Sequence, residues 1–379
     1  AIAIGTGGPF GAEGPIIATG GALGSAIGQF IKVTGQERKT LLAAGAAAGM
    51  TAIFGTPIAS VLIAIELLLF EYRARSVVPV ALAAAAAGGL RAIIHGAGPV
   101  FMMPAIDTPN ATTDVIATLI GALVGVVSVY VTKIVYWIED WFEELPIHWM
   151  WWPALGGIAV GVVGFFSPHT LGVGYDNIDN ILSGHLAGQA VVVFCLLKFA
   201  SWCVSLGTGT SGGTLAPLFT IGGGLGAGLG ALCVWLLPSL GVDERVAALV
   251  GMAAMFAGAS RALLASVVFA FETTRQPMSL LPLLGGCTAA YLVSAMTMRN
   301  TIMTEKIARR GLRVVTDYTA DFLAQVLVSA VAAAPVVVLR ADDTLESVRT
   351  WIGKHAEGSA HQGFPVVDDD DRIVGVVTR

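Results

Sequence analysis

The chain has 379 residues, of which 55% are hydrophobic and only 12% are charged, and its formal net charge is −5. Soluble domains carry about a quarter of charged residues, so this composition excludes an ordinary soluble protein and predicts a polytopic, all-α membrane protein. The charge distribution does not suggest a nucleic acid partner, and the four cysteines lie in apolar segments without the spacing of a disulfide framework or a zinc site.

Apolar segments follow one another along most of the chain and are predicted to be helices. Several are shorter than the roughly 20 residues that cross a bilayer, and many contain Gly or Pro. Such broken helices are typical of transporters, in which helix ends meet near the middle of the membrane. The more polar stretches 98–111 and 167–187 are predicted to lie at the membrane surfaces. The expected helices are 15–33, 38–53, 57–72, 76–97, 112–142, 152–166, 188–206, 217–237, 244–258, 261–275 and 279–298.

The chain changes character after the last apolar segment. Lys306, Arg309, Arg310 and Arg313 follow it closely, and this excess of positive charge predicts that the C-terminal end faces the cytoplasm. We therefore expect a membrane domain over 1–311, a linker over 312–334 and a small domain over 335–379.

The last 45 or so residues have the pattern of a small α/β unit. Residues 336–339 are predicted to be a strand, and Asp343 with Glu346 has capping-box spacing before a helix. Residues 363–378 then read as two strands joined at the acidic turn 368–371.

Two stretches of the membrane domain share an unusual sequence pattern, GAEGPIIATGGALGSAIG at 11–28 and GTLAPLFTIGGGLGAGLG at 213–230. The similarity continues downstream and predicts an internal duplication. Each copy opens with glycine and has proline in the first turn of a helix, whose free N–H groups and dipole favour an anion. The aligned pairs include Pro15 with Pro217, Gly20 with Gly222, Gly45 with Gly251, Ala59 with Ala265 and Glu66 with Glu272.

Three ionisable residues stand out in this apolar context. Glu13 aligns with Leu215, so the local fold does not need a carboxylate there, and we interpret Glu13 as functional. Glu66 aligns with another acid, Glu272, which favours a shared structural role such as bonding to backbone N–H groups. Lys198 lies within an apolar helix and has two open interpretations: it adds positive potential to an anion path, or it snorkels to an interface.

The duplication, its two motifs and the C-terminal segment together resemble the CLC family of chloride channels and chloride/proton antiporters. Gly11 to Pro15 correspond to the family's GREGP motif, Gly213 to Pro217 to its GxFxP motif, and GFPVVDDDDRIVGVVTR resembles a cytoplasmic CBS repeat. The resemblance implies an inverted-repeat bundle of tilted and broken helices, a homodimer with one pore in each subunit, and Glu13 as the gate. It also implies an anion site formed by Gly11, Ala12, Gly14, Pro15, Gly213, Thr214, Leu215, Ala216, Pro217, Leu218 and Met303.

The chain departs from the family pattern at several of these positions. Ala12 replaces a basic residue, Leu215 a phenylalanine, and Met303 a tyrosine whose hydroxyl bonds the central anion, a bond that a thioether cannot donate. The family's serine-bearing segment would precede residue 1, so we expect N-terminal helices to be missing from the chain. The proton pathway of the antiporters would run through Glu13 and Glu66, but the inner acid that follows Glu66 in those proteins is Leu67 here.

These features predict a channel-like chloride transporter of the plasma membrane, not an enzyme, with no metal and no cofactor other than an adenine nucleotide at a complete CBS pair. The first alternative is a chloride/proton antiporter that uses another proton route. The second is a nucleotide-sensing CBS module that the membrane part anchors. The sequence does not determine which halide is preferred.

Overall fold

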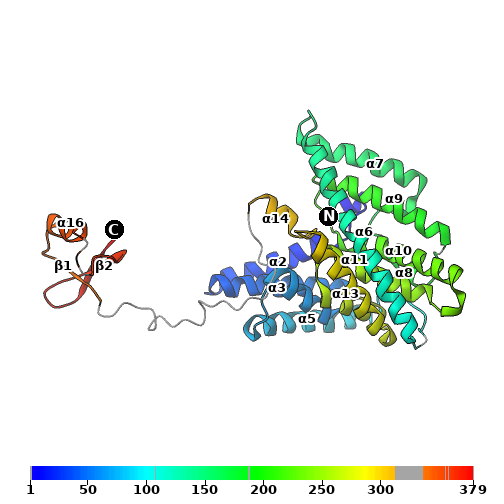
Figure 1. The fold of residues 1–379 in the computed structure, drawn as a ribbon, viewed down its shortest axis with the longest axis horizontal. Coiled ribbons are helices and arrows are strands. Elements are labelled where there is room, and N and C mark those ends of the chain that lie inside the picture. Colours follow the sequence, from blue (N-terminus) through cyan, green and yellow to red (C-terminus); the bar gives the residue numbers. More distant parts are fainter. Residues whose placement is uncertain are drawn as a thin grey trace. The chain divides into compact units, whose positions relative to one another are not determined.

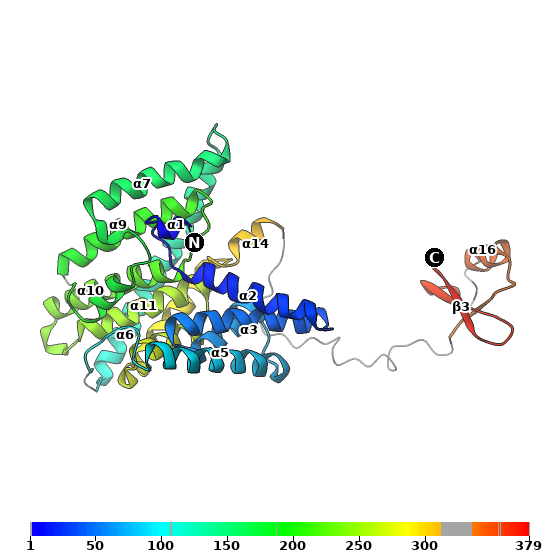
Figure 2. The ribbon, with the colours of Figure 1, turned by 180° about the vertical axis from the view of Figure 1, so that it is seen from behind.

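A computed structural model describes residues 2–106, 108–186, 188–311, 336–354, 356 and 358–378. The chain divides into two compact units, Ala1–Tyr318 and Thr319–Arg379. The regular elements of the described part of the first unit are helices, joined by loops (Figures 1 and 2). The predicted linker 312–334 lies outside the described residues.

The helices of the first unit correspond to the predicted apolar segments, with ends shifted by a few residues. In its first half they are α1 (Ile2–Gly5), α2 (Glu13–Phe30), α3 (Gly35–Phe54), α4 (Pro57–Ile63) with its π-helical continuation η1 (Ala64–Leu69), α5 (Ala74–His95) and α6 (Ala111–Glu143). In its second half they are α7 (Trp152–Phe166), α8 (Tyr175–Leu182), α9 (Gly188–Gly207), α10 (Leu215–Leu236), α11 (Glu244–Ser260), α12 (Leu263–Thr274), α13 (Leu280–Thr297) and α14 (Glu305–Arg309).

Six helical stretches among the described residues are long and apolar enough to cross a membrane. Two shorter apolar helices, α4 with η1 and α12, are too short to do so alone, as the sequence predicts. The six stretches are Ala74–His95, Ala111–Glu143, Trp149–Phe166, Gly188–Gly207, Leu215–Leu236 and Pro277–Thr297.

The stretch 167–187, predicted to lie at a membrane surface, contains the helix α8, which the sequence pattern did not indicate. This helix buries Ile178, Ile181 and Leu182, whose spacing of three and four residues places them on one face, against α10 and α11. Interleaved Asp and Asn residues and the glycines before Tyr175 hide the helix from a hydropathy pattern.

The aligned glycines of the two repeats make equivalent contacts. A methyl group at Gly20 or Gly45 would overlap the carbonyl oxygen of the other residue, and the same close approach joins Gly222 to Gly251. Helix α2 therefore packs against α3 as α10 packs against α11, through small residues that let backbones approach in lipid. This equivalence supports the predicted duplication.

Helix α11 lies at the centre of the core. Every one of its residues from Val246 to Ser260 is buried, and most are Ala, Gly or Met, which allows α6, α10 and α13 to pack around it. Next to it, Phe219 contacts Phe256 and Phe269 with ring centroids 5.6 and 4.9 Å apart. The centre of the bundle is thus closely packed, and a binding site has room only where helices end.

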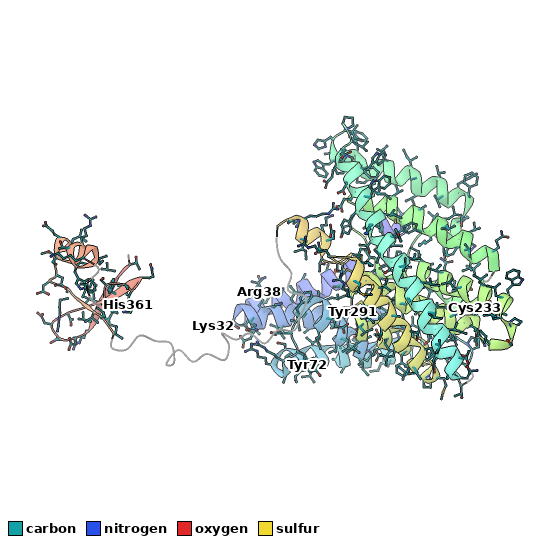
Figure 3. All side chains as sticks on the ribbon, viewed as in Figure 1. Lys32, Arg38, Tyr72, Cys233, Tyr291 and His361 are labelled. Carbon is teal, nitrogen blue, oxygen red and sulfur yellow. The ribbon has the colours of Figure 1, made fainter. Side chains whose placement is uncertain are left out.

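Polar side chains mark the ends of several helices. Lys32, Arg38 and Tyr72 gather at the end of the unit formed by α2, α3 and the start of α5 (Figure 3). Tyr72 is 74% exposed. Near α14, Lys306 forms an ion pair with Glu139 at 2.7 Å, and Arg309 pairs with Asp140, so charged groups join α14 to the end of α6.

The described residues of the second unit form a small three-stranded sheet with one helix. Its elements are β1 (Leu339–Arg340), α16 (Leu345–Gly353), β2 (Gly363–Val367) and β3 (Ile373–Thr378). Strand β1 is parallel to β2, and β3 is antiparallel to it, so the prediction of two strands joined at the acidic turn is confirmed. The strand expected at 336–339 begins only at Leu339, the last residue of the expected range.

The predicted capping pair before α16 is wrong. The N-cap is Thr344, whose hydroxyl accepts a hydrogen bond from the N–H of Ser347. The Asp343 carboxylate instead accepts a bond from the N–H of Arg340 at 2.8 Å. Thr344 follows Asp343 directly and can cap a helix in the same way, so residue spacing alone does not show which of the two is the N-cap.

Candidate functional site

The two glycine motifs, far apart in the sequence, meet in the structure. Gly11 and Gly213 form an antiparallel bridge in which the N–H of each donates to the carbonyl oxygen of the other, at 3.1 and 3.2 Å. Gly14 lies against the same loop, because a Cβ built on it would be 3.3 Å from the nitrogen of Gly213. The starts of α2 and α10 are therefore held side by side.

Both of these helix starts lack a side-chain cap. Ala12 and Thr214 occupy the N-cap positions, and neither gives a side-chain hydrogen bond to the first turn. Proline follows within each first turn, at Pro15 and Pro217, where the missing N–H costs no helical bond. Two uncapped helix starts direct N–H groups and positive dipole ends into one place, an arrangement that favours an anion.

The Glu13 carboxylate lies at this junction. The residue is 3% exposed, and its Oε2 atom is so close to Gly11 and Gly213 that a Cβ on either glycine would contact it. That oxygen has no hydrogen-bond partner among the described residues, while Oε1 accepts a bond from the Tyr175 hydroxyl at 3.1 Å. A negative group of the chain itself thus lies beside the two helix starts.

Lys198 is buried behind the same site. It is fully buried, and its Nζ donates to the carbonyl oxygens of Thr170 and Gly172, both at 2.9 Å. The interpretation that it snorkels to an interface is therefore wrong, because its amine is bonded inside the protein. Its Nζ lies beside the turn that precedes Tyr175, 3.4 Å from a Cβ built on Gly174, so the other interpretation, a positive potential at the anion path, stays a prediction.

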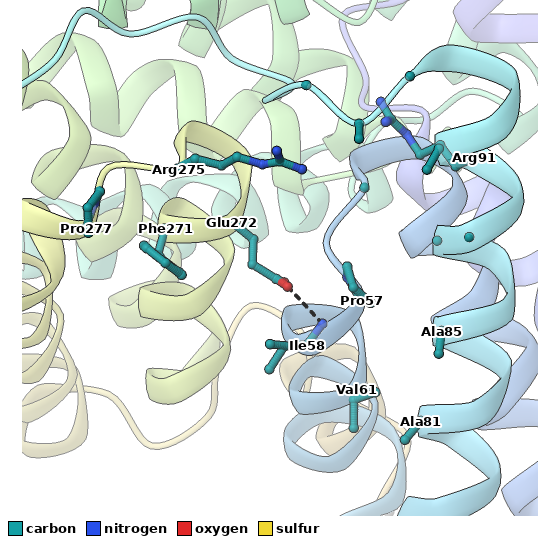
Figure 4. A pocket seen from close by; sticks show the side chains of 17 residues that line it. Pro57, Ile58, Val61, Ala81, Ala85, Arg91, Phe271, Glu272, Arg275 and Pro277 are labelled. Carbon is teal, nitrogen blue, oxygen red and sulfur yellow. Dashed lines mark hydrogen bonds between the residues drawn. The ribbon is translucent and has the colours of Figure 1, made fainter.

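Glu66 and Glu272 make matching contacts at a second junction. The Glu66 carboxylate accepts bonds from the N–H groups of Leu264 and Ala265 at 3.2 and 3.1 Å, at the start of α12. The Glu272 carboxylate accepts bonds from those of Ile58 and Ala59 at 3.1 and 2.8 Å, at the start of α4 (Figure 4). Each acid satisfies the first turn of the other repeat's short helix, as expected of a structural role.

A cavity of about 950 Å³ lies beside this second junction. Figure 4 shows Arg91 and Arg275 extending toward it from opposite walls, with Ala81, Ala85 and Val61 deeper along α4 and α5. Glu13 does not line this cavity. The hollow therefore belongs to the α4, α5 and α12 face and not to the candidate anion site.

The structure does not bring every predicted residue to Glu13. Leu67 lies in the π-helical segment after Glu66 and packs, partly buried, against the main core. Met303, in the turn before α14, is also partly buried and packs against the main core. That turn is fixed by the Tyr136 hydroxyl, which donates to the carbonyl oxygen of Ile302 at 2.7 Å, and by the N–H of Ile302, which donates to Ala259 at 3.0 Å.

Sequence reasoning missed Tyr175, the side chain bonded to Glu13. It lies in the stretch interpreted as surface, and nothing in the sequence pattern places it beside a residue so far from it in the chain. The usable signal is local: Gly172 and Gly174 both have positive φ, and the tyrosine follows them directly at the start of α8. Glycines before an aromatic residue indicate a turn, but they do not show which distant residue the aromatic side chain contacts.

Comparisons with known proteins agree with this geometry. A family model described as voltage gated chloride channel matches residues 1–295. The chain is 29% identical over 315 residues to the H(+)/Cl(-) exchange transporter ClcA of Vibrio parahaemolyticus, covering 81% of this chain and 67% of the relative. It is 29% identical over 289 residues to the protein of the same name from Vibrio cholerae, covering 74% and 62%.

Solved structures share the fold. A slow cyanobacterial Cl−/H+ antiporter superimposes with a TM-score of 0.75 at 24% identity, over 82% of this chain and 73% of the other. A eukaryotic CLC transporter does so with a TM-score of 0.67 at 22% identity, over 98% and 66%. Together with six apolar helices long enough to cross a bilayer, these matches describe a multi-pass membrane protein. The chain belongs to the CLC family of voltage gated chloride channels.

Proposed function

We propose that this protein carries chloride across the membrane and that Glu13 is its gate. The observation that carries the proposal is the position of the Glu13 carboxylate, buried between the uncapped starts of α2 and α10. An anion attracted to these helix starts has to compete with a carboxylate already there. Protonation removes the charge of the carboxyl group and with it the attraction, so the path opens at lower pH.

The same geometry supports assigning the predicted anion-binding residues to the two motif loops. Gly11, Gly14 and Gly213 bring the backbones together, and the first turns of α2 and α10 supply N–H groups. Leu215, the repeat partner of Glu13, is only 6% exposed and gives the site an apolar wall. We keep Met303 in the proposal with less structural support, since its contacts are to the core.

Two modes of chloride transport remain in competition. The named relatives are H(+)/Cl(-) exchange transporters, which favours antiport. Leu67 favours a channel-like mode, because proton movement through an apolar interior needs titratable groups or water and this position offers a hydrocarbon. We propose the channel-like mode with weak proton coupling, and we keep antiport as the second candidate.

A vesicle experiment separates the two modes. Liposomes containing the protein receive a chloride gradient, and chloride efflux and external pH are recorded together. We expect chloride to move with little uphill proton movement, and we expect Leu67→Glu to increase proton movement by adding a titratable group. Robust uphill proton pumping by the unaltered protein, abolished in Glu13→Gln, would make antiport the correct mode.

The remaining features of the proposal come from the resemblance. They are a homodimer, a plasma membrane location, a cytoplasmic C-terminus and, at a complete pair of CBS repeats, an adenine nucleotide. Exposed apolar side chains on α4, α12 and α13, namely Ile58, Leu264 and Leu281, are compatible with either lipid or a second copy. A purely regulatory CBS module has less support, because most of the chain forms the membrane unit that surrounds Glu13.

A further inference from the structure

We propose that Tyr175 is a positioning residue for the gate, whose hydroxyl holds the ionised Glu13 carboxylate between the starts of α2 and α10. The inference rests on the proposed function of Glu13 and adds a residue that restrains it. It assigns to α8 the role of setting the pH at which the gate is released.

The contact itself is selective. The Tyr175 hydroxyl donates to Oε1 of Glu13 at 3.1 Å, and Oε2 has no hydrogen-bond partner in the described part of the chain. The hydroxyl is therefore the one side-chain donor found on this carboxylate among the described residues. A bond from a hydroxyl to a carboxylate is charge-assisted, and it weakens when the carboxyl group is protonated.

The tyrosine ring is held so that the hydroxyl has a fixed direction. Phe54 packs edge-on against it with ring centroids 5.4 Å apart, and Phe101 lies 6.4 Å away on another side. Both phenylalanines are 1% exposed and belong to the main core. A ring enclosed in this way cannot follow Glu13 when the carboxyl group leaves, so the bond breaks on release.

The start of α8 is held as firmly as the ring. Gly174, at the N-cap, has a φ of 79°, which only glycine adopts without strain, and the Asn177 side chain donates to the carbonyl oxygen of His169 at 2.8 Å. The two bonds from Lys198 to Thr170 and Gly172 bind the same loop to α9. At the other side of α8, Asp179 accepts a bond from the N–H of Met102 at 2.5 Å.

Among the described residues, Tyr175 of α8 contacts Glu13 directly, and the Lys198 amine of α9 lies beside the turn before it, 3.4 Å from a Cβ built on Gly174. Lys198 forms no ion pair with Glu13, because its amine is bonded to two carbonyl oxygens instead. The neutral hydroxyl makes the direct contact with Glu13, while the cation is held by the carbonyl groups of the loop before Tyr175. Tyr175 is consequently the residue whose removal changes the contact without changing the charge of the site.

The test is Tyr175→Phe, measured as chloride flux from liposomes over a range of pH. Because a donor to the ionised carboxylate is lost, we expect the pH of half-maximal flux to rise by about one unit, equivalent to a tenfold change in the balance of the two protonation states. A fluorinated tyrosine at the same position is a stronger donor, and it should lower the half-maximal pH. This second variant keeps the size of the side chain and tests the idea even if Tyr175→Phe folds poorly.

A matched control removes another partly buried tyrosine hydroxyl, away from the motif loops. Tyr291 of α13 is partly buried, as Tyr175 is, and Tyr291→Phe should leave the half-maximal pH unchanged. The double variant Glu13→Gln with Tyr175→Phe should behave as Glu13→Gln alone, because the hydroxyl acts only through the carboxylate.

The outcomes distinguish this inference from the proposed function. If Glu13→Gln loses the pH dependence but both changes at Tyr175 leave the half-maximal pH in place, the gate stands and the positioning role is wrong. A pH dependence that persists in Glu13→Gln would overturn the gate and, with it, the role of Tyr175. A shift in Tyr291→Phe as large as that in Tyr175→Phe would reduce the effect to general loss of packing and contradict the inference.

Discussion

Replacing Glu13 with glutamine is expected to make chloride flux independent of pH and to raise it about tenfold at neutral pH. A carboxylate at a partly buried helix start is stabilised by up to about 2 kcal/mol, and roughly 1.4 kcal/mol corresponds to a factor of ten in occupancy. Glutamine has a similar shape but no charge, so it competes less well with an anion for the same N–H groups. Flux from liposomes, recorded across the pH range in the same preparation, measures both effects.

The matched control for this change is Glu144→Gln. Glu144 is an exposed acid at the end of α6, far from the motif loops in the sequence, and its replacement should leave both flux and pH dependence unchanged. If Glu13→Gln retains the pH dependence of the unaltered protein, Glu13 is not the gate, whatever its position between the two helix starts.

Replacing Glu66 or Glu272 with glutamine is expected to destabilise the membrane unit by about 1–3 kcal/mol in each case, because a hydrogen bond from a backbone N–H to a charged, partly buried carboxylate is lost. Each carboxylate accepts two backbone N–H groups at the start of a helix from the other repeat. A glutamine side chain offers one oxygen and turns a donor toward the second N–H. A lower midpoint of thermal unfolding in detergent, with Glu144→Gln as the control, checks this.

The two substitutions should also be coupled. Glu66 belongs to η1 at the end of α4, whose start Glu272 caps, so both acids act on the contact between α4 and α12. Once one carboxylate is gone, loss of the other should cost less than it does alone. If Glu66→Gln has the unfolding midpoint of the unaltered protein and loses only proton movement, Glu66 instead belongs to a proton pathway.

The sequence predicts much of the fold because its signals are local or repeated. Apolar length gives the helices, and the aligned glycines give the packing of α2 on α3 and of α10 on α11. The repeat comparison also separates Glu13, which has an apolar partner, from Glu66, which has an acidic one. This separation agrees with the side-chain contacts of both residues, since Glu66 accepts bonds from the first turn of α12 and Glu13 accepts one from the Tyr175 hydroxyl.

The errors arise where a distant partner decides the role of a residue. Lys198 lies in an apolar helix and could equally have reached an interface, but the carbonyl groups of Thr170 and Gly172 bind its amine inside the protein. Tyr175 lies in a polar stretch whose helix α8 is too short and too mixed in composition to be recognised. Neither the Lys198 contact nor the Tyr175 contact gives a periodic pattern in the sequence, because each joins segments that are far apart in the chain and meet only in the folded protein.

The central claim is that the junction of α2 and α10 is an anion site from which the Glu13 carboxylate excludes the anion. Bromide can replace chloride and is located by its anomalous scattering in crystals of the unaltered protein and of Glu13→Gln. We expect the Glu13→Gln crystals to show bromide beside Gly14 and the first turn of α10, at a position that the carboxylate occupies in the unaltered protein. Bromide bound elsewhere in both proteins, with this junction empty in Glu13→Gln, would contradict the account.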